Sequence, residues 1–240
     1  MTTKGKKSYF SWSSEFNSNN YTPINVINKL FDSLVKPILL YGSEIWGASC
    51  KYLLKGNFIN YLLKSNMKYE LFLSNICKHM LGVKKRASHL GCKAELGMFP
   101  INLTIMQRII HYYIRVKEMD DKTLAKKALL HQNIIYLNEC NTDGIIKRSF
   151  LHSVVSAVKF SGCNHFELNK KSNKISHSSK MNLSSNLKQN YSQLFFKYLN
   201  DNKDNINLRS YIKFKKNYKK ELYVDAIVSP ALSCNKIKNF

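Results

Sequence analysis

The 240-residue sequence has few acidic residues, few glycines and no long apolar run. No stretch approaches the roughly 18 uninterrupted apolar residues of a membrane span, so we expect no transmembrane helix and no membrane partner. The first segment has no apolar core of the signal-peptide type, so an intracellular location, nucleus or cytoplasm, is expected. The nine glycines form no GxxxxGK[ST] loop, which argues against a phosphate-binding loop of that type.

The six cysteines are irregularly spaced and form no CxxC pair, so we expect reduced thiols rather than a disulfide framework. Cys77, His79, His89 and Cys92 lie close enough in sequence to be considered as zinc ligands. On a helix, however, Cys77 and His79 point to different sides, because they are only two residues apart. Cys77 fits better on the apolar face of that helix, and we expect no metal, no cofactor and no small-molecule ligand.

Catalytic patterns are also missing. No histidine belongs to a recognisable hydrolase arrangement with serine or cysteine. The only adjacent acid pair, Asp120 and Asp121, ends a helical pattern and has no strand-type residues beside it. We interpret the pair as a solvated helix terminus at which Asp121 caps the next helix at Lys122. The sequence therefore offers no candidate catalytic residue.

The chain has a formal net charge of +23, from 38 Lys plus Arg against 15 Asp plus Glu. An excess of this size favours a partner with a phosphate backbone, such as RNA, DNA or an RNA–DNA hybrid, because bound phosphates release condensed counterions. A second explanation is also open. The chain has 33 Lys but five Arg, together with 26 Asn, and AT-rich coding DNA would supply both lysine and asparagine.

Helical periodicity predicts an all-α fold, an irregular helical bundle whose first helix is kinked. Residues 23–47 carry apolar side chains at steps of three and four. These are Ile27, Leu30, Phe31, Leu34, Ile38, Tyr41 and Ile45. Thr22 is the expected cap and Pro23 the expected first helical residue. Pro37 removes a backbone hydrogen bond, which predicts a kink near Ser33.

Further helices are expected at residues 67–81, 89–96, 100–118, 124–137 and 145–160. Gly82 and Gly97 mark the ends of the first two of these. With the kinked helix they make a predicted helical unit, residues 23–160. Residues 1–22 are expected to be a disordered leader. Residues 161–185 are expected to be a mobile linker, since they are rich in Ser, Asn and Lys.

The last predicted parts are a basic helical piece, residues 186–225, and a disordered tail, residues 226–240. Two helical patterns, QLFFKYL and LRSYIKFKKNYKKELY, define the basic piece. Whether it packs on the helical unit is left open by the sequence.

Four blocks of the chain, in order, resemble one protein family. They are FDSLVKPILLYGSEIWG (31–47), ICKHMLGVKKRASHLGCKAELGMFPI (76–101), MQRIIHYYIRV (106–116) and LRSYIKFKKNYKKELYV (208–224). They are similar to the thumb and the following helical region of reverse transcriptases from non-LTR (LINE-like) retrotransposons. For a full-length parent, the resemblance implies RNA-directed DNA synthesis, with these helices gripping template and primer.

The family's chemistry uses an aromatic-x-Asp-Asp turn and a further acid to hold two divalent cations. This motif is absent from the chain, and only about 22 residues precede the first block, too few for a palm domain. The family's Arg- and His-bearing block is also missing after Tyr223, which could reflect a frame shift or a gene-model artefact. We therefore expect a non-catalytic fragment without polymerase activity.

Two groups of residues are candidates for binding nucleic acid. Arg108, His111 and Arg115 share one face of the 100–118 helix, at spacings of three and four. A different face carries the expected buried stripe of Ile105, Ile109, Tyr112 or Tyr113, and Val116. The second group is a run of lysines interleaved with Phe214 and Tyr218. Its lysines are Lys213, Lys215, Lys216, Lys219 and Lys220.

Each group has a simpler interpretation. The arginine and histidine face could be an ordinary solvated helix surface. The aromatic residues of the lysine run, with Tyr211, also follow helical spacing and could be core residues. The competing functions for the whole chain are a helical protein-interaction module, or a product with no selected function.

Overall fold

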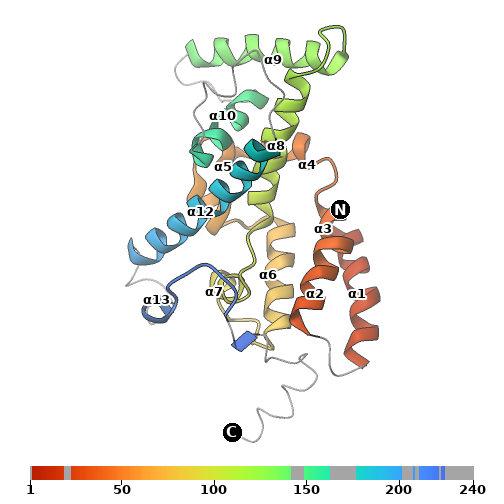
Figure 1. Cartoon of the computed structure of the whole chain (residues 1–240), viewed down its shortest axis with the longest axis vertical. Coiled ribbons are helices and arrows are strands. Elements are labelled where there is room, and N and C mark those ends of the chain that lie inside the picture. Colours follow the sequence, from red (N-terminus) through yellow and green to blue (C-terminus); the bar gives the residue numbers. More distant parts are fainter. Residues whose placement is uncertain are drawn as a thin grey trace, which may run out of the picture. The chain divides into compact units, whose positions relative to one another are not determined.

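A computed structural model of the chain describes residues 2–18, 23–141, 149–162, 177–201, 208, 211–221 and 223–224. The regular elements in these ranges are helices, which confirms the predicted all-α fold (Figure 1). Several expectations lie outside the described residues. These are the cap at Thr22, the helix start at 145–148, most of the linker (163–176) and the tail (226–240).

The chain forms two compact units, each built from separated stretches of sequence. Unit 1 contains Met1–Tyr41, Ser65–Ile101 and Phe196–Phe240, and unit 2 contains Gly42–Lys64 and Asn102–Phe195. The predicted boundaries followed the order of the sequence and therefore differ from this division. Residues 23–160 are shared between the two units, and the end of the chain belongs with its beginning.

Unit 1 begins with α1 (Thr2–Ser18), so the prediction of a disordered leader is wrong for these residues. Tyr9 anchors the helix. It is 3% exposed, its hydroxyl lies 3.1 Å from His79 Nδ1, and its ring meets Phe72 edge to face. Gly5 allows close packing as well, because an added Cβ would lie 2.8 Å from the Leu39 side chain. These tertiary contacts order a segment whose sequence shows little apolar periodicity.

The kinked helix comprises α2 (Ile24–Leu30), η1 (Phe31–Val35) and α3 (Lys36–Leu39). Pro23 precedes the first turn rather than occupying it, and its carbonyl accepts from Val26 N at 2.9 Å. The predicted break near Ser33 is confirmed, and it takes the form of a π turn in which Lys36 N–H reaches back to Phe31 O. A π turn inserts one residue where Pro37 cannot donate.

The buried face of this helix differs from the predicted one. Buried positions are Ile24, Ile27, Phe31, Val35 and Leu39, whereas Leu34 is 45% exposed. The extra residue of the π turn shifts the buried face to steps of four beyond Phe31. The helix also ends earlier than predicted. The chain turns through Gly42 at φ 63°, so Tyr41 and Ile45 do not continue the stripe and are 77% and 55% exposed.

Two further helices of unit 1, α6 (Lys68–Met80) and α7 (His89–Glu95), match their predicted positions. Gly82 and Gly97 follow them with positive φ, as expected for helix ends. A buried ion pair joins the two helices, with Lys93 Nζ 2.6 Å from a Glu70 carboxylate oxygen. The pair lies beside Phe72, Ile76 and Met80 on the apolar face of α6.

The end of the chain packs onto unit 1 through a mostly non-helical segment. Only α13 (Tyr211–Phe214) is helical in the described part of 208–224, apart from a single turn at 223–224, so the long predicted helix is wrong. Tyr218 is buried, donates to Met98 O at 2.8 Å and packs on Phe99, with ring centroids 5.0 Å apart. Phe214, also expected in the core, is 81% exposed.

Unit 2 is centred on α8 (Ile101–Lys117), which belongs to this unit from Asn102 onward. Its predicted buried stripe is confirmed, with Tyr113 rather than Tyr112 in the buried position. The short elements α4 (Ser43–Trp46), η2 (Gly47–Ser49), α5 (Lys51–Leu54) and η3 (Ile59–Leu63) belong to the same unit. Gly47 packs so closely that an added Cβ would lie 2.3 Å from the Ile105 side chain.

Helices α9 (Leu124–Asn141) and α10 (Phe150–Ser161) pack on each other in unit 2. Thr123, not Asp121, caps α9, because Thr123 Oγ1 accepts from Lys126 N at 3.4 Å. Glu139 connects the two helices. Its carboxylate lies 2.9 Å from His152 Nε2 and accepts from Ser149 N at 3.1 Å.

Helix α12 (His177–Asp201) begins inside the predicted linker, so the linker boundary at residue 185 is wrong. Its buried residues recur at steps of four, which gives the helix one apolar face. They are Leu183, Leu187, Tyr191, Phe195 and Leu199. Residues 177–182 are mostly polar, so the sequence did not predict the first turns of this helix.

Candidate functional site

The structure brings Arg108, His111 and Arg115 together on α8, where all three line a hollow of about 320 Å³. Glu44 and Glu118 line the same hollow. Arg108 lies 3.7 Å from the Glu44 carboxylate and donates to Ser43 Oγ at 3.2 Å. The predicted group therefore exists, but two carboxylates offset the charge of its two arginines.

Arg115 is exposed, and its guanidinium lies over the Tyr112 ring, 5.3 Å from the ring centre. A cation in this position is attracted by the ring and keeps its outer edge in water. His111 is half-buried between the two arginines. With Glu44 and Glu118 in the same hollow, the formal charges of the two arginines are balanced.

In the lysine run, Lys215 is the exception. Its side chain is 1% exposed, donates to Lys219 O at 2.7 Å and pairs with Glu221. The prediction of Lys215 as a binding residue is therefore wrong, because its ammonium is enclosed by the fold. Helical spacing alone had placed all five lysines around a core of aromatic rings.

The other lysines of the run remain at the surface. Lys213, Lys216 and Lys219 are exposed, while Lys220 is half-buried and its ammonium lies 2.5 Å from Asn25 Oδ1. This contact connects the segment 211–221 to the start of α2. Three of the five predicted lysines, Lys213, Lys216 and Lys219, are therefore accessible to an external anion.

A second basic group escaped the sequence-based selection. Lys84, Lys85 and Arg86 are all exposed in the loop between α6 and α7. The buried Lys78 ammonium supports this loop by donating to Lys85 O at 2.6 Å. The signal in the sequence is three consecutive basic residues shortly after Gly82, a position at which the helix dipole by itself also favours cations.

Residues on either side of the two basic groups line one hollow in unit 1. Val83 and Ser88, which bracket Lys84–Arg86, line a hollow of about 250 Å³ together with Tyr211 and Tyr223, which bracket the lysine run. The backbone also joins these regions, since Glu221 N donates to Glu95 O at 3.0 Å. Sequence reasoning could not find this proximity, because more than a hundred residues separate the two segments.

Four carboxylates of unit 1 already make close polar contacts. Lys93 holds Glu70 at 2.6 Å, Lys36 holds Asp32 at 3.1 Å, Lys215 holds Glu221, and the Tyr223 hydroxyl donates to Glu95. The lysine partners offset the charges of Glu70, Asp32 and Glu221, whereas the partner of Glu95 is an uncharged hydroxyl. The exposed lysines around the hollow keep their positive charge toward solvent.

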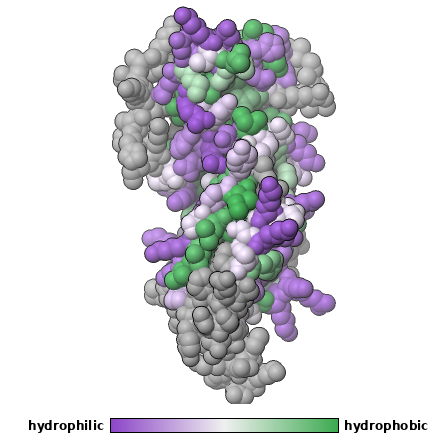
Figure 2. All heavy atoms as spheres, turned by 90° about the vertical axis from the view of Figure 1, so that its right-hand side faces the viewer, coloured by the Kyte–Doolittle hydropathy of each residue, from purple (hydrophilic) through white to green (hydrophobic). Residues whose placement is uncertain are grey.

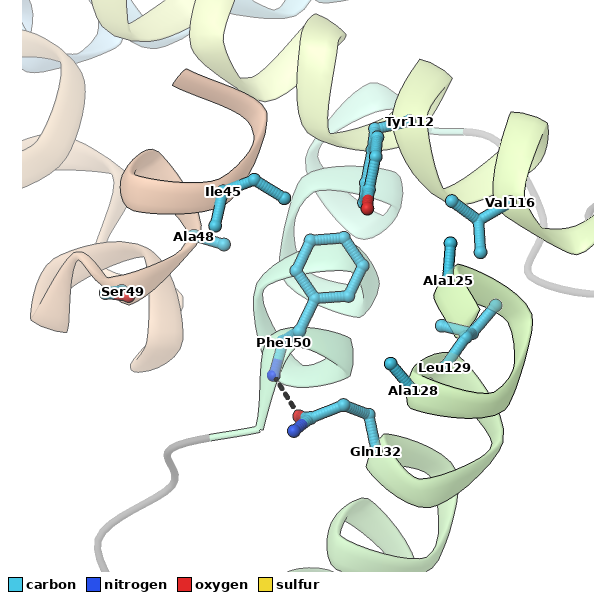
Figure 3. A pocket seen from close by; sticks show the side chains of 10 residues that line it. All are labelled: Ile45, Ala48, Ser49, Tyr112, Val116, Ala125, Ala128, Leu129, Gln132 and Phe150. Atoms are coloured by element: carbon cyan, nitrogen blue, oxygen red, sulfur yellow. Dashed lines mark hydrogen bonds between the residues drawn. The ribbon is translucent and has the colours of Figure 1, made fainter. Parts of the chain in front are cut away.

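A second hollow, of about 310 Å³, lies in unit 2 (Figure 3). Figure 3 shows Tyr112 and Phe150 pointing toward each other across it, with Ile45 on one side and Val116 and Leu129 on the other. Gln132 closes one end, and its Oε1 accepts from Phe150 N at 3.0 Å. The walls are mainly apolar, so charged ligands would find little to bind there.

The residues considered for zinc lie in separate contacts. Cys77 Sγ is 3.6 Å from Met98 Sδ, His79 contacts Tyr9, and His89 Nε2 is 3.5 Å from Lys78 Nζ. Burial raises the pKa of the Cys77 thiol to about 12, which disfavours the thiolate that a metal would need. Within the described ranges, no cluster of three or more His, Cys, Asp or Glu side chains could hold a metal ion.

Asp120 and Asp121 are exposed in the turn between α8 and α9. Asp120 Oδ1 accepts from Lys122 N at 3.0 Å, and Asp121 lies 3.9 Å from the Lys126 ammonium. Both carboxylates thus take part in local turn contacts.

Figure 2 shows one face of the molecule, where hydrophilic side chains surround smaller groups of hydrophobic ones. No helix in the described part of the chain combines the length and apolar character that crossing a bilayer requires.

Comparisons with known proteins do not identify a family for this chain. No family model, curated protein or solved structure matches it.

Proposed function

We propose that this chain is a non-catalytic, basic helical region of a non-LTR retrotransposon reverse transcriptase, and that unit 1 binds the phosphate backbone of RNA, DNA or an RNA–DNA hybrid. The four sequence blocks support the family, and the net charge of +23 supports the class of partner. Of the two predicted groups, the lysine run of unit 1 is the main binding surface, and the loop Lys84–Arg86 of the same unit is added to it.

One observation carries the proposal. Residues that flank Lys84–Arg86 and residues that flank the lysine run line the same hollow, and Lys84–Arg86, Lys213, Lys216 and Lys219 are exposed. Lysine partners offset the charges of Glu70 and Glu221 in the same unit. Such a surface attracts phosphates and positions them without reading sequence. The α8 group contributes less, because Glu44 and Glu118 share its hollow.

The test compares three variants that each remove three positive charges. The loop variant replaces Lys84, Lys85 and Arg86 by Ala, and the segment variant replaces Lys213, Lys216 and Lys219 by Ala. The control variant replaces Lys51, Lys55 and Lys159, which are exposed in unit 2, by Ala. Binding to an RNA–DNA hybrid is measured by fluorescence anisotropy across a salt series.

For the native chain we expect affinity to fall steeply with salt. Each lost phosphate contact should reduce the slope of log K against log[salt] by about 0.9, taking the value for a B-form duplex, so the loop and segment variants should each lose about 2 to 3 units. The control variant should keep the native slope. Equal losses in all three variants would show that only overall charge matters, and a flat salt dependence would end the proposal.

A helical protein-interaction module is the second candidate, and one observation on α9 favours it. Leu130, Ile134 and Leu137 follow helical spacing and are 48%, 58% and 59% exposed. An apolar stripe of this kind suits a partner helix. Ile134→Lys would abolish that function and leave the salt-dependent binding of nucleic acid unchanged, which separates the two candidates.

A further inference from the structure

The hollow of unit 1 has a mainly apolar wall. It is lined by Leu81 and Val83, which follow α6, by Gly91 and Cys92 of α7, and by Leu208. Two aromatic rings, Tyr211 and Tyr223, complete the lining. Tyr223 is 55% exposed, so its ring is reachable from solvent.

Glu95 is the one carboxylate among the lining residues. The Tyr223 hydroxyl donates to Glu95, and the Glu95 carboxylate also contributes to the raised pKa of Tyr211. Burial is the main cause that raises the pKa of both tyrosines, so both hydroxyls remain protonated donors. An ionised carboxylate has about four acceptor positions, so two tyrosines leave acceptor capacity for a ligand.

The charges around the hollow differ from the charge inside it. Lys84 follows the lining residue Val83 directly, and Lys213 lies two residues after the lining residue Tyr211. A phosphate is therefore attracted to the rim and repelled by Glu95 inside. A neutral ring that carries N–H donors suits the interior.

Resting on the proposed function, we infer that this hollow takes one unstacked base of single-stranded RNA or DNA. The base ring packs against the tyrosines and the apolar wall, while the flanking phosphates lie on Lys84–Arg86 and Lys213. Base stacking on aromatic side chains is favourable for every base. Glu95 accepts from exocyclic amino groups, as carboxylates do from cytosine, and so favours bases that carry one.

The experiment uses the full chain and three probes of equal length, each made as DNA and as RNA. The first is a cytosine-containing single strand, the second is the same strand with its bases replaced by abasic sites, and the third is the duplex. The phosphates of the two single strands are the same, so only the bases distinguish them. The duplex keeps its bases stacked and out of reach of the hollow.

We expect the cytosine strand to bind about tenfold more tightly than the abasic strand. Tyr223→Leu should remove this difference, because it takes away the ring, whereas Tyr223→Phe should keep most of it. Tyr41→Leu, at a tyrosine that is 77% exposed in the same unit, serves as the control and should leave the difference intact. The DNA and RNA probes show whether the sugar contributes.

Two failures are distinguishable. If cytosine and abasic strands bind equally and remain salt-dependent, the base site is refuted and the phosphate surface stands. If neither strand binds, the proposed function fails as well. Circular dichroism of each variant checks that the helical fold persists.

Discussion

Lys215 and Lys216 are adjacent in sequence and have opposite roles in the structure. Lys215 is enclosed and holds Lys219 O and Glu221, whereas Lys216 is exposed. Removing either the buried ammonium or its partners destabilises the fold. The polar group that remains is still buried, but it no longer has the hydrogen bond that offset its desolvation. The same residue type therefore stabilises the fold at one position and can meet an anion at the next.

Replacing Lys215 by Met should lower the free energy of unfolding by about 1–3 kcal/mol, because two charge-assisted hydrogen bonds are lost. Lys216→Met should change stability by less than about 0.5 kcal/mol, since its side chain is exposed. Chemical denaturation of both variants measures the difference. Equal stabilities would contradict the enclosed position of Lys215.

At the scale of elements, glycines decide where segments approach one another. Gly97 follows α7 at φ 63°, and a Cβ there would lie 2.5 Å from Lys220 N and 3.1 Å from Lys219 C. The obstacle is backbone, which cannot rotate away as a side chain can. The glycine therefore lets the lysine-bearing segment pack against the end of α7.

Gly97→Ala should destabilise the chain by more than the roughly 1–2 kcal/mol expected for a left-handed alanine alone. Gly56→Ala is the matched control, because Gly56 has φ 65° but an added Cβ there would lie 4.0 Å from Ser156 Oγ, an ordinary contact distance. Denaturation midpoints give the stabilities, and hydrogen exchange of residues 215–221 reports whether the segment has come away. Equal effects at both glycines would mean that strain, not contact, determines the cost.

The elements also show which local signals survive tertiary packing. Helix ends at Gly82 and Gly97 and the break before Pro37 follow from backbone chemistry, and the structure keeps all three. Helix α1 is held by long-range contacts of Tyr9 with His79 and Phe72, and α12 is helical well before its first buried residue, Leu183. Sequence reasoning therefore placed helix ends well and missed helices held by a few buried side chains.

For the whole molecule, the two units are built from stretches that are distant in sequence. This arrangement explains why the candidate site could be predicted only in part. The basic residues were visible in the sequence, but their grouping depends on Tyr218 packing on Phe99 and on Glu221 bonding to Glu95. Lys215 was misassigned for the same reason, since Glu221 encloses it.

The purified chain should give no product above background in a primer-extension assay with Mg²⁺ and an RNA template. Polymerase chemistry needs carboxylates that hold two divalent cations together. In this chain the adjacent acids Asp120 and Asp121 are exposed in the turn between α8 and α9, where Asp121 lies 3.9 Å from Lys126. Template-dependent synthesis would show that a catalytic site has been overlooked.

The sequence by itself determined the all-α class, the strong positive charge, the helix ends at Gly82 and Gly97 and the break before Pro37, because periodicity, glycine, proline and charge act over a few residues. The tertiary structure alone decided which lysines are enclosed, which segments share the hollow of unit 1 and how the chain divides into units. Those outcomes depend on contacts between residues far apart in sequence, and local patterns carry no information about such contacts.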